Sequence, residues 1–189
     1  IVFGQVKVYI PDVNFRSFLN SNYSSTMDSS GDSLLIEEAA KKTGTFYCRF
    51  ENIVDLSGIE HFTGISVLDC YYNDIVNIPD LSNLTSLKEL DCGKNALTFI
   101  PKLPVSIEIL SFSDNPISEF PDLSNNIALK QIYLRETQIA NIPDLSANIA
   151  LEKLSCYSNS LLTNLPDLSS NIALTELSCF DNKLTGLPN

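Results

Sequence analysis

One short pattern recurs seven times along the chain at a nearly constant distance. In each copy an apolar residue is followed two positions later by Cys, Phe or Leu, and most copies carry Asn three positions after that. We call this Cys, Phe or Leu the marker residue; the markers stand at 48, 70, 92, 112, 134, 156 and 179, so they are 22, 22, 20, 22, 22 and 23 residues apart. A single repeat of this length cannot bury its own apolar face, so successive copies must stack to build a continuous core.

The repeat predicts one strand and one extended return per copy. In each copy a polar or aromatic residue stands between two apolar residues, the second of which is the marker. This alternation with a period of two is typical of a strand. Proline stands nine residues past most markers, where it blocks helix and favours an extended path. These prolines are Pro79, Pro101, Pro121, Pro143 and Pro188, with Pro166 displaced by one because Leu162 is inserted. Stacked copies should form a parallel sheet on one side and an extended return on the other.

Asparagine marks the point at which the chain leaves each predicted strand. It recurs as Asn73, Asn95, Asn115, Asn159 and Asn182. A buried amide can both donate to and accept from backbone groups of the turn, so the stacked copies should form a ladder. Thr137 takes this position in the fifth copy and offers fewer hydrogen bonds, which predicts a local weak point.

An apolar residue three positions before each strand segment completes the pattern L-x-x-L-x-(L/C)-x-x-N-x-L. These residues are Ile65, Leu87, Ile107, Leu129, Leu151 and Leu174. The pattern resembles that of the leucine-rich-repeat family over residues 44–189. The resemblance implies an α/β solenoid, mostly β: a right-handed superhelix with a parallel concave β-sheet, an extended convex side and an N-terminal helical cap. The short third copy is similar to repeats of bacterial effector proteins, which implies a bacterial origin.

Residues 6–44 do not repeat and are expected to form the cap that shields one end of the core. A first helix should begin after Asp12 as its N-cap, and its buried face would hold Phe15, Phe18 and Leu19. A second helix should close at Gly44, and its apolar face would hold Ile36, Ala39 and Ala40. A cap followed by repeats resembles secreted bacterial leucine-rich-repeat proteins of internalin-like organisation. Seven turns, the last incomplete, are assigned to 45–189.

Residues 1–5 run from apolar to small and polar and do not begin with Met. They are interpreted as the remnant of a signal peptide, and the alternative is an edge strand continuing into Val6, Val8 and Ile10. Export agrees with the family resemblance, so we expect a protein secreted from a bacterium or displayed on its outer surface.

The segment between the two expected cap helices invites a weak calcium hypothesis. Asp28, Ser30, Asp32 and Glu38 are the candidate oxygen ligands. An EF-hand loop wants Gly at position 6 and Glu at position 12, whereas Ser33 and Ala39 stand there. A plain polar turn is the preferred interpretation, and no other cofactor is expected.

Five cysteines in an exported protein would ordinarily suggest disulfides. Here all five are markers, and the other two markers are Phe112 and Leu134, so the position is a core position where Cys behaves as a small hydrophobe. We therefore expect reduced, buried thiols. Zinc is disfavoured because no C-x-x-C spacing occurs, and the only histidine, His61, lies on the return side of the first turn. The sequence indicates no enzyme in this segment.

The strand residues that point away from the core would form the concave face, and five of the seven tyrosines fall there. Tyrosine joins apolar area to a polar tip, which suits interface anchors; the expected binding residues are Tyr47, Phe50, Tyr71, Tyr72, Tyr133, Arg135, Tyr157 and Phe180. The alternative is that aromatic residues simply suit exposed strands. A protein partner is the leading hypothesis. A glycan that stacks on these rings is the second.

Two further partner classes are disfavoured. The net charge of −11 leaves no basic face for nucleic acid, and no apolar run is long enough to span a membrane. A third functional hypothesis makes the array the targeting part of a larger enzyme, because the sequence stops at 187–189, partway through a turn.

Overall fold

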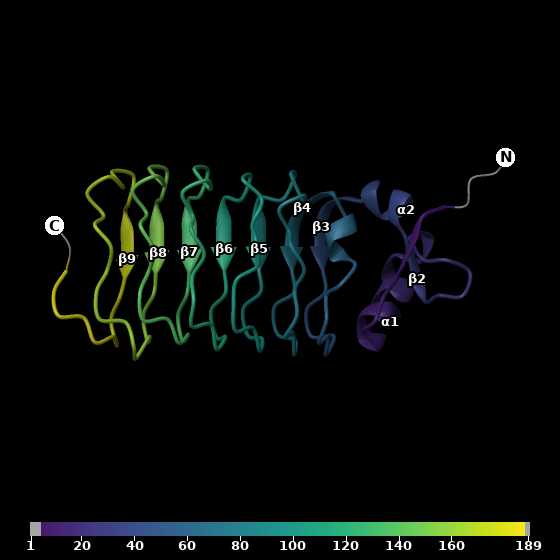
Figure 1. The fold of residues 1–189 in the computed structure, drawn as a ribbon, viewed down its shortest axis with the longest axis horizontal. Coiled ribbons are helices and arrows are strands. Elements are labelled where there is room, and N and C mark those ends of the chain that lie inside the picture. Colours follow the sequence, from purple (N-terminus) through teal and green to yellow (C-terminus); the bar gives the residue numbers. More distant parts are fainter. Residues whose placement is uncertain (1–4, 188–189) are drawn as a thin grey trace.

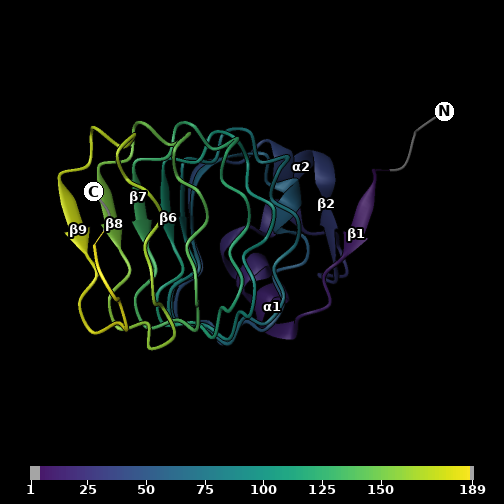
Figure 2. The same cartoon turned by 60° about the vertical axis from the view of Figure 1, so that its left-hand side comes forward.

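The computed structural model describes residues 5–187, and its main feature is one parallel sheet of seven strands in the order of the sequence. Figure 1 shows the strands side by side with the cap at one end. They are β3 (Thr43–Tyr47), β4 (Gly64–Asp69), β5 (Glu89–Asp91), β6 (Ile109–Ser111), β7 (Gln131–Tyr133), β8 (Lys153–Ser155) and β9 (Glu176–Ser178). In Figure 2 the turns follow one another as parallel loops. The predicted leucine-rich-repeat solenoid is confirmed.

The strands pair in the register that the repeat predicts. Leu68 lies opposite Leu90, and Leu90 lies opposite Leu110, so equivalent core residues stack from turn to turn. The return side is extended apart from a 3-10 turn, η2 (Ile59–His61). In the sixth turn Leu162 is fully buried while Leu161 is half exposed. The expectation that Leu162 is the inserted residue was therefore wrong: Leu162 fills the core position.

The five cysteines are free, and the expectation that they line the core is confirmed. Four are fully buried, and Cys179 in the last turn is partly buried. The Sγ atoms of Cys70 and Cys92 on neighbouring strands lie 3.2 Å apart, as an S–H group in contact with a sulfur acceptor.

The predicted asparagine ladder is present. The Nδ2 of Asn73 donates to the carbonyls of Cys48 and Cys70, at 2.7 and 3.0 Å, and its Oδ1 accepts from the Ile53 N–H at 3.1 Å. Thr137 interrupts the ladder as expected. Its hydroxyl contacts only the Leu134 carbonyl, at 3.5 Å, and Asn159 Oδ1, at 2.5 Å. An asparagine at 137 would accept a hydrogen bond from the Ile117 N–H, which donates instead to the Asn115 carbonyl.

Each turn leaves its strand through a left-handed residue, a feature that the sequence did not predict. The residue two past each marker has φ between 53° and 60°; these are Phe50, Tyr72, Lys94, Asp114, Glu136, Ser158 and Asp181. None is Gly or Asn, although this conformation costs other residues about 1 kcal/mol. The first six donate their N–H to a carbonyl of the next turn at 2.8–3.2 Å. The inter-turn bonds therefore hold the strained conformation.

The cap consists of β1 (Lys7–Tyr9), α1 (Val13–Asn22), the 3-10 turn η1 (Ser24–Thr26), β2 (Ser33–Leu35) and α2 (Ile36–Ala40). Asp12 is the N-cap of α1, with its carboxylate 2.8 Å from the Phe15 N–H, as predicted. The second helix ends at Ala40 rather than near Gly44, because Gly44 belongs to β3. β1 and β2 pair as an antiparallel ribbon.

Aromatic packing joins the cap to the first turn. The Phe46 ring of β3 stacks on Tyr23 at 4.6 Å between centroids and meets Phe62 edge-on at 4.9 Å and Phe18 at 5.7 Å. Rings from the cap thus cover the end of the apolar core next to β3.

The proposed signal-peptide remnant lies almost wholly outside the described residues, which begin at Gln5. Among residues 5–187, no helix is long and apolar enough to cross a membrane.

Candidate binding surface

The concave face carries a first group of rings beside the cap, which we call the cap-side patch: Phe50, Tyr71 and Tyr72. The Phe50 ring lies 5.0 Å from Tyr72 and 6.1 Å from Tyr71, and the two tyrosine rings are 6.2 Å apart. Phe50 and Tyr72 occupy the left-handed position of adjacent turns, so the backbone hydrogen bonds between turns set the direction of their side chains. Tyr47 on β3 is 60 % exposed and adds a fourth aromatic surface.

Cations hold the rings of the cap-side patch. The guanidinium of Arg49 lies 5.7 Å from the Tyr71 centroid, and the ammonium of Lys94 lies 4.8 Å from that of Tyr72. Arg49 also pairs with the buried carboxylate of Asp69, and this hydrogen bond raises the pKa of Arg49. Cation–π contacts of this kind contribute about 0.5–1 kcal/mol at exposed sites. The rings are therefore ordered without a ligand.

A second group, the far patch, consists of Tyr157 and Phe180 with Arg135. The two rings stack at 4.4 Å with an interplanar angle of 10°. Arg135 donates to the Tyr157 hydroxyl at 3.3 Å and pairs with Asp114 at 2.9 Å. The hydrogen bond to Tyr157 is the largest cause of the raised pKa of Arg135. Tyr133 stands apart from the stacked pair and donates its hydroxyl to Gln131 at 2.8 Å.

Small side chains separate the two patches. The sheet between them carries Gly93, Ser111 and Ser113. A Cβ atom at Gly93 would lie 3.1 Å from Cδ2 of Tyr71 and 3.2 Å from a carboxylate oxygen of Asp91. Gly93 therefore gives the Tyr71 ring the room to lie over the next strand, and any larger residue would push the ring away.

A shallow groove of about 300 Å³ adjoins the cap-side patch at the ends of the strands. It is lined by Tyr72, Asn73, Asp74, Lys94, Asn95, Ala96 and Asp114. The rings and the groove together form a surface with apolar and charged parts side by side.

Sequence reasoning missed part of this face. The contacts of Arg49 and Lys94 with the rings were not predicted. The first outward position of the strands was also omitted: Val67, Glu89, Ile109, Gln131, Lys153 and Glu176. The period of two along each strand would have found this column, whereas ring contacts between turns have no signature in the sequence.

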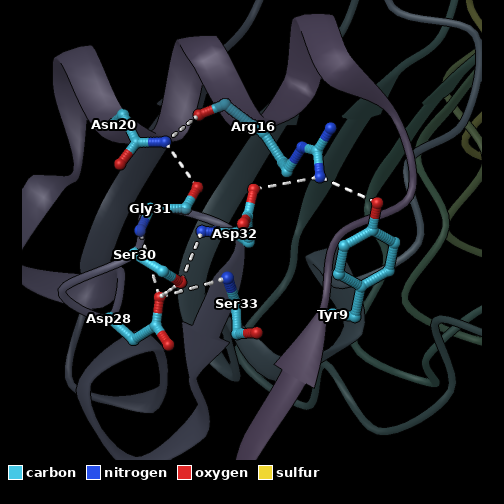
Figure 3. A network of polar contacts seen from close by, with 8 residues as sticks. All are labelled: Tyr9, Arg16, Asn20, Asp28, Ser30, Gly31, Asp32 and Ser33. Atoms are coloured by element: carbon cyan, nitrogen blue, oxygen red, sulfur yellow. Dashed lines mark hydrogen bonds and ion pairs between the residues drawn. The ribbon is translucent and has the colours of Figure 1, made fainter.

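Three of the four candidate calcium ligands, Asp28, Ser30 and Asp32, make hydrogen bonds within the cap (Figure 3). Asp28 accepts from Ser30 Oγ at 2.6 Å and pairs with Lys7 at 2.9 Å; its pKa is lowered by the Ser30 hydrogen bond first and by Lys7 next. Asp32 pairs with Arg16, and Glu38 pairs with Lys41. Across residues 5–187, no group of three or more His, Cys, Asp or Glu side chains is arranged to hold a metal. The three carboxylates therefore pair with basic side chains that lie outside the loop.

The thiols and the histidine do not come together. Burial raises the pKa of Cys48 and Cys92 well above the ordinary thiol value and that of Cys156 to about 12. His61 lies 3.5 Å from the carboxylate of Glu60, its neighbour in sequence. A nucleophilic thiol needs a lowered pKa and a base within hydrogen-bond reach. These buried thiols have the opposite environment.

No protein-family model and no curated protein matches the sequence, but solved structures share its fold. Internalin C2 from Listeria monocytogenes aligns with a TM-score of 0.70 and 21 % identity, over 94 % of this chain and 88 % of that one. The leucine-rich-repeat domain of a Shigella effector gives 0.64 and 26 %, over 76 % and 61 %. The functional domain of InlJ from Listeria monocytogenes, which includes a cysteine ladder, gives 0.51 and 25 %, over 98 % and 50 %. The chain therefore has the fold of the bacterial leucine-rich-repeat proteins.

Proposed function

We propose that the chain is a protein-binding module that recognises its partner through the concave face. The observation that carries this proposal is the grouping of exposed and half-buried rings into two patches by cation–π, stacking and hydrogen-bond contacts. The proposed contact residues are Tyr47, Phe50, Tyr71, Tyr72, Tyr133, Arg135, Tyr157 and Phe180.

The size and chemistry of this face suit a protein partner. Six strand spacings of about 4.8 Å give a face about 29 Å long, which accommodates a standard interface of about 800 Å² per partner. Rings that are already ordered lose little side-chain entropy on binding, so less of the contact energy is spent on ordering. Tyr and Arg are the residue types that most often dominate such interfaces.

The resemblance to internalin-like proteins supports a place outside the bacterial cell. We infer a protein secreted from a bacterium or displayed on its outer surface, where the concave face would meet its partner. Detection of the native protein in culture medium or on intact cells with a specific antibody would test this inference; detection only after cell lysis would contradict it.

A glycan is the second candidate ligand, because Tyr157 and Phe180 form a stacked pair in which Phe180 is 58 % exposed. Sugars stack on exposed ring faces of this kind. Binding assays with proteins and with glycans distinguish the two candidates.

The experiment compares the purified protein with a Tyr71→Ala/Tyr72→Ala/Tyr157→Ala variant on a protein array and a glycan array. Phe99→Ala is the matched control, since Phe99 is 44 % exposed and lies past the strand end, outside the sheet. We expect some protein spots to bind wild type and Phe99→Ala with equal affinity. The same spots should bind the triple variant at least about tenfold more weakly. Far-UV circular dichroism should be the same for all three.

Protein spots that retain the triple variant would refute the concave face as the binding surface. Ring-dependent spots on the glycan array alone would replace the protein partner with a glycan.

A further inference from the structure

A row of exposed aliphatic side chains runs along the edge at which the chain enters the strands. Four residues, Val105, Ile127, Ile149 and Ile172, form what we call the isoleucine row. Each stands two residues before the apolar residue that precedes a strand segment by three positions. Their exposed fractions are 64, 64, 62 and 90 %. The row lies on the returns of turns three to six, at the opposite ends of the strands from the left-handed residues and their groove.

Neither packing nor backbone conformation explains these residues. The equivalent positions of the first two turns are Thr63 and Thr85, so the turn does not require an aliphatic side chain there. Copying of a repeat does not explain the row either. Val105 belongs to the third return, which lacks the Pro-Asp-Leu-Ser sequence of its neighbours and still presents an aliphatic side chain.

The segments that carry the row are uncharged, and charged residues lie on both sides of them. Segments 103–107, 123–129, 145–151 and 168–174 contain no charged residue, although the chain has 35 (12 basic and 23 acidic). On the strand side, Lys130 and Lys88 pair with Glu108 at 2.7 and 3.0 Å, so the charges there largely neutralise one another.

On the return side, a column of aspartates precedes the row: Asp122, Asp144 and Asp167. Each carboxylate accepts the N–H of a serine two residues on, at 2.8–2.9 Å. The backbone hydrogen bond is the largest cause of the lowered pKa of Asp122 and Asp167. Among the described residues none of the three pairs with a basic side chain. The three aspartates form a line of negative charge in the returns that carry Ile127, Ile149 and Ile172, whereas Lys102 holds the equivalent position in the third return.

We propose that the isoleucine row docks an amphipathic helix of a partner protein, with aliphatic residues on one face and Lys or Arg along the border of that face. The spacing of the row favours a helix. Adjacent turns of the solenoid are about 4.8 Å apart at the sheet, which is close to the helical pitch of about 5.4 Å. The four residues of the row therefore match about three turns of a helix. In an extended partner strand, residues on one face are about 6.6 Å apart, so they would lose register with the row. The basic border would pair with the aspartate column.

The same charges disfavour the other occupants of an apolar edge. A second copy of the chain, docked row to row, would bring two aspartate columns together in a protein whose net charge is already −11. An anionic membrane would be repelled by the same carboxylates. The proposal concerns a different surface from the concave face, so either proposal can fail alone.

The test is a selection from a displayed library of 18-residue helical peptides, in which apolar residues are fixed at positions i, i+4, i+7 and i+11 and the flanking positions are random. The library is selected on the wild-type protein. Enriched peptides are synthesised, and their affinity is measured by fluorescence anisotropy. The key variant is Ile127→Ser/Ile149→Ser. Leu161→Ser is the matched control because Leu161 is a half-exposed aliphatic residue at the other end of the strands.

We expect enrichment of Lys and Arg at the flanks and a loss of affinity of at least about tenfold in Ile127→Ser/Ile149→Ser, since two buried isoleucines contribute more than the 1.4 kcal/mol that a factor of ten represents. Leu161→Ser should bind as wild type does, and Asp122→Asn/Asp144→Asn should bind more weakly with less dependence on salt. Thermal melts check that each variant is folded.

Three results would overturn the proposal: no enriched peptide, enriched peptides with acidic flanks, or affinities that the isoleucine variant leaves unchanged. Sedimentation showing a dimer that Ile127→Ser/Ile149→Ser abolishes would assign the row to a second copy instead.

Discussion

Two columns of buried or half-buried asparagine run through the solenoid, and they differ in what their amides do. The strand-end column consists of Asn73, Asn95, Asn115, Asn159 and Asn182, and the strand-start column of Asn126, Asn148 and Asn171. In the first, Asn159 accepts from the Thr137 N–H at 2.8 Å and donates to the carbonyls of Leu134 and Cys156 at 2.8 and 2.7 Å. In the second, Asn148 donates to the Leu123 and Asn126 carbonyls, but its buried Oδ1 has no hydrogen-bond partner, and neither has that of Asn171.

The difference shows that burial of a polar residue does not by itself establish a structural requirement. The strand-start position holds Phe62, Leu84 and Pro104 in earlier turns, and each accepts the same backbone hydrogen bond from the N–H three residues on. Leu123 and Asn126 carbonyls likewise keep backbone donors when the side-chain amide is disregarded. The strand-end asparagine instead satisfies a turn N–H that has no other acceptor.

Replacing Asn159 with Leu should produce the largest effect. The Thr137 N–H would lose its acceptor inside the core, and the Leu134 carbonyl would keep only a long contact to the Thr137 hydroxyl. One or two unsatisfied buried groups cost about 2–3 kcal/mol, and urea unfolding followed by circular dichroism would measure the loss. A variant as stable as wild type would show that water replaces the amide.

Alkaline pH should lower the stability of the protein through the marker residue Cys156. Burial first, and Cys179 next, raise the pKa of Cys156 to about 12, whereas an unfolded thiol titrates near pH 8.5. The folded state therefore keeps its proton when the unfolded state has lost it, so this stability is complete below about pH 8.5 and is lost as pH rises towards 12. Between pH 8 and 9.5 the loss is about 1 kcal/mol for one such thiol. The measurement is the free energy of unfolding of wild type and Cys156→Val at both pH values; equal pH dependence of the two would contradict the assignment.

Thr137→Asn should close the gap in the strand-end column. The new amide would reach the Phe112 carbonyl and the Ile117 N–H, as Asn115 reaches Cys92 and Leu97 in the preceding turn. A gain of about 1 kcal/mol is expected from the added hydrogen bonds, seen as a higher urea midpoint. Thr137→Val, which keeps the shape and removes the hydroxyl, is the control and should not stabilise the protein by this route.

Asn148→Leu should have the smallest effect of the four, within about 0.5 kcal/mol of wild type, because an apolar group of similar size replaces an amide whose oxygen is unpaired. Leu84 already occupies this position in the second turn. Urea unfolding of Asn148→Leu beside Asn159→Leu tests the comparison directly, and equal losses in the two variants would remove the distinction between the columns.

The sequence determined much of this fold and little of the surface geometry. Strand positions, the inward role of the cysteines, the strand-end asparagines and the gap at Thr137 all followed from the repeat, because the period of two assigns inward and outward side chains within a strand. The first cap helix followed from Asp12, whose carboxylate acts within one turn of its own chain. The second helix was misplaced at its end because Gly44 joins β3, and only pairing with β4 reveals this.

What the tertiary structure alone decided depends on contacts between residues about one repeat apart. Left-handed Phe50 and Tyr72 are held by hydrogen bonds to the following turn, so their own residue types gave no signal. The choice between Leu161 and Leu162 for the core, and the position of the Tyr71 ring over Gly93, were likewise settled by neighbouring turns. A repeat specifies which side chains point inward, because that is a property of one strand. How the outward side chains group into a surface is decided by stacking, because each group draws its members from several turns.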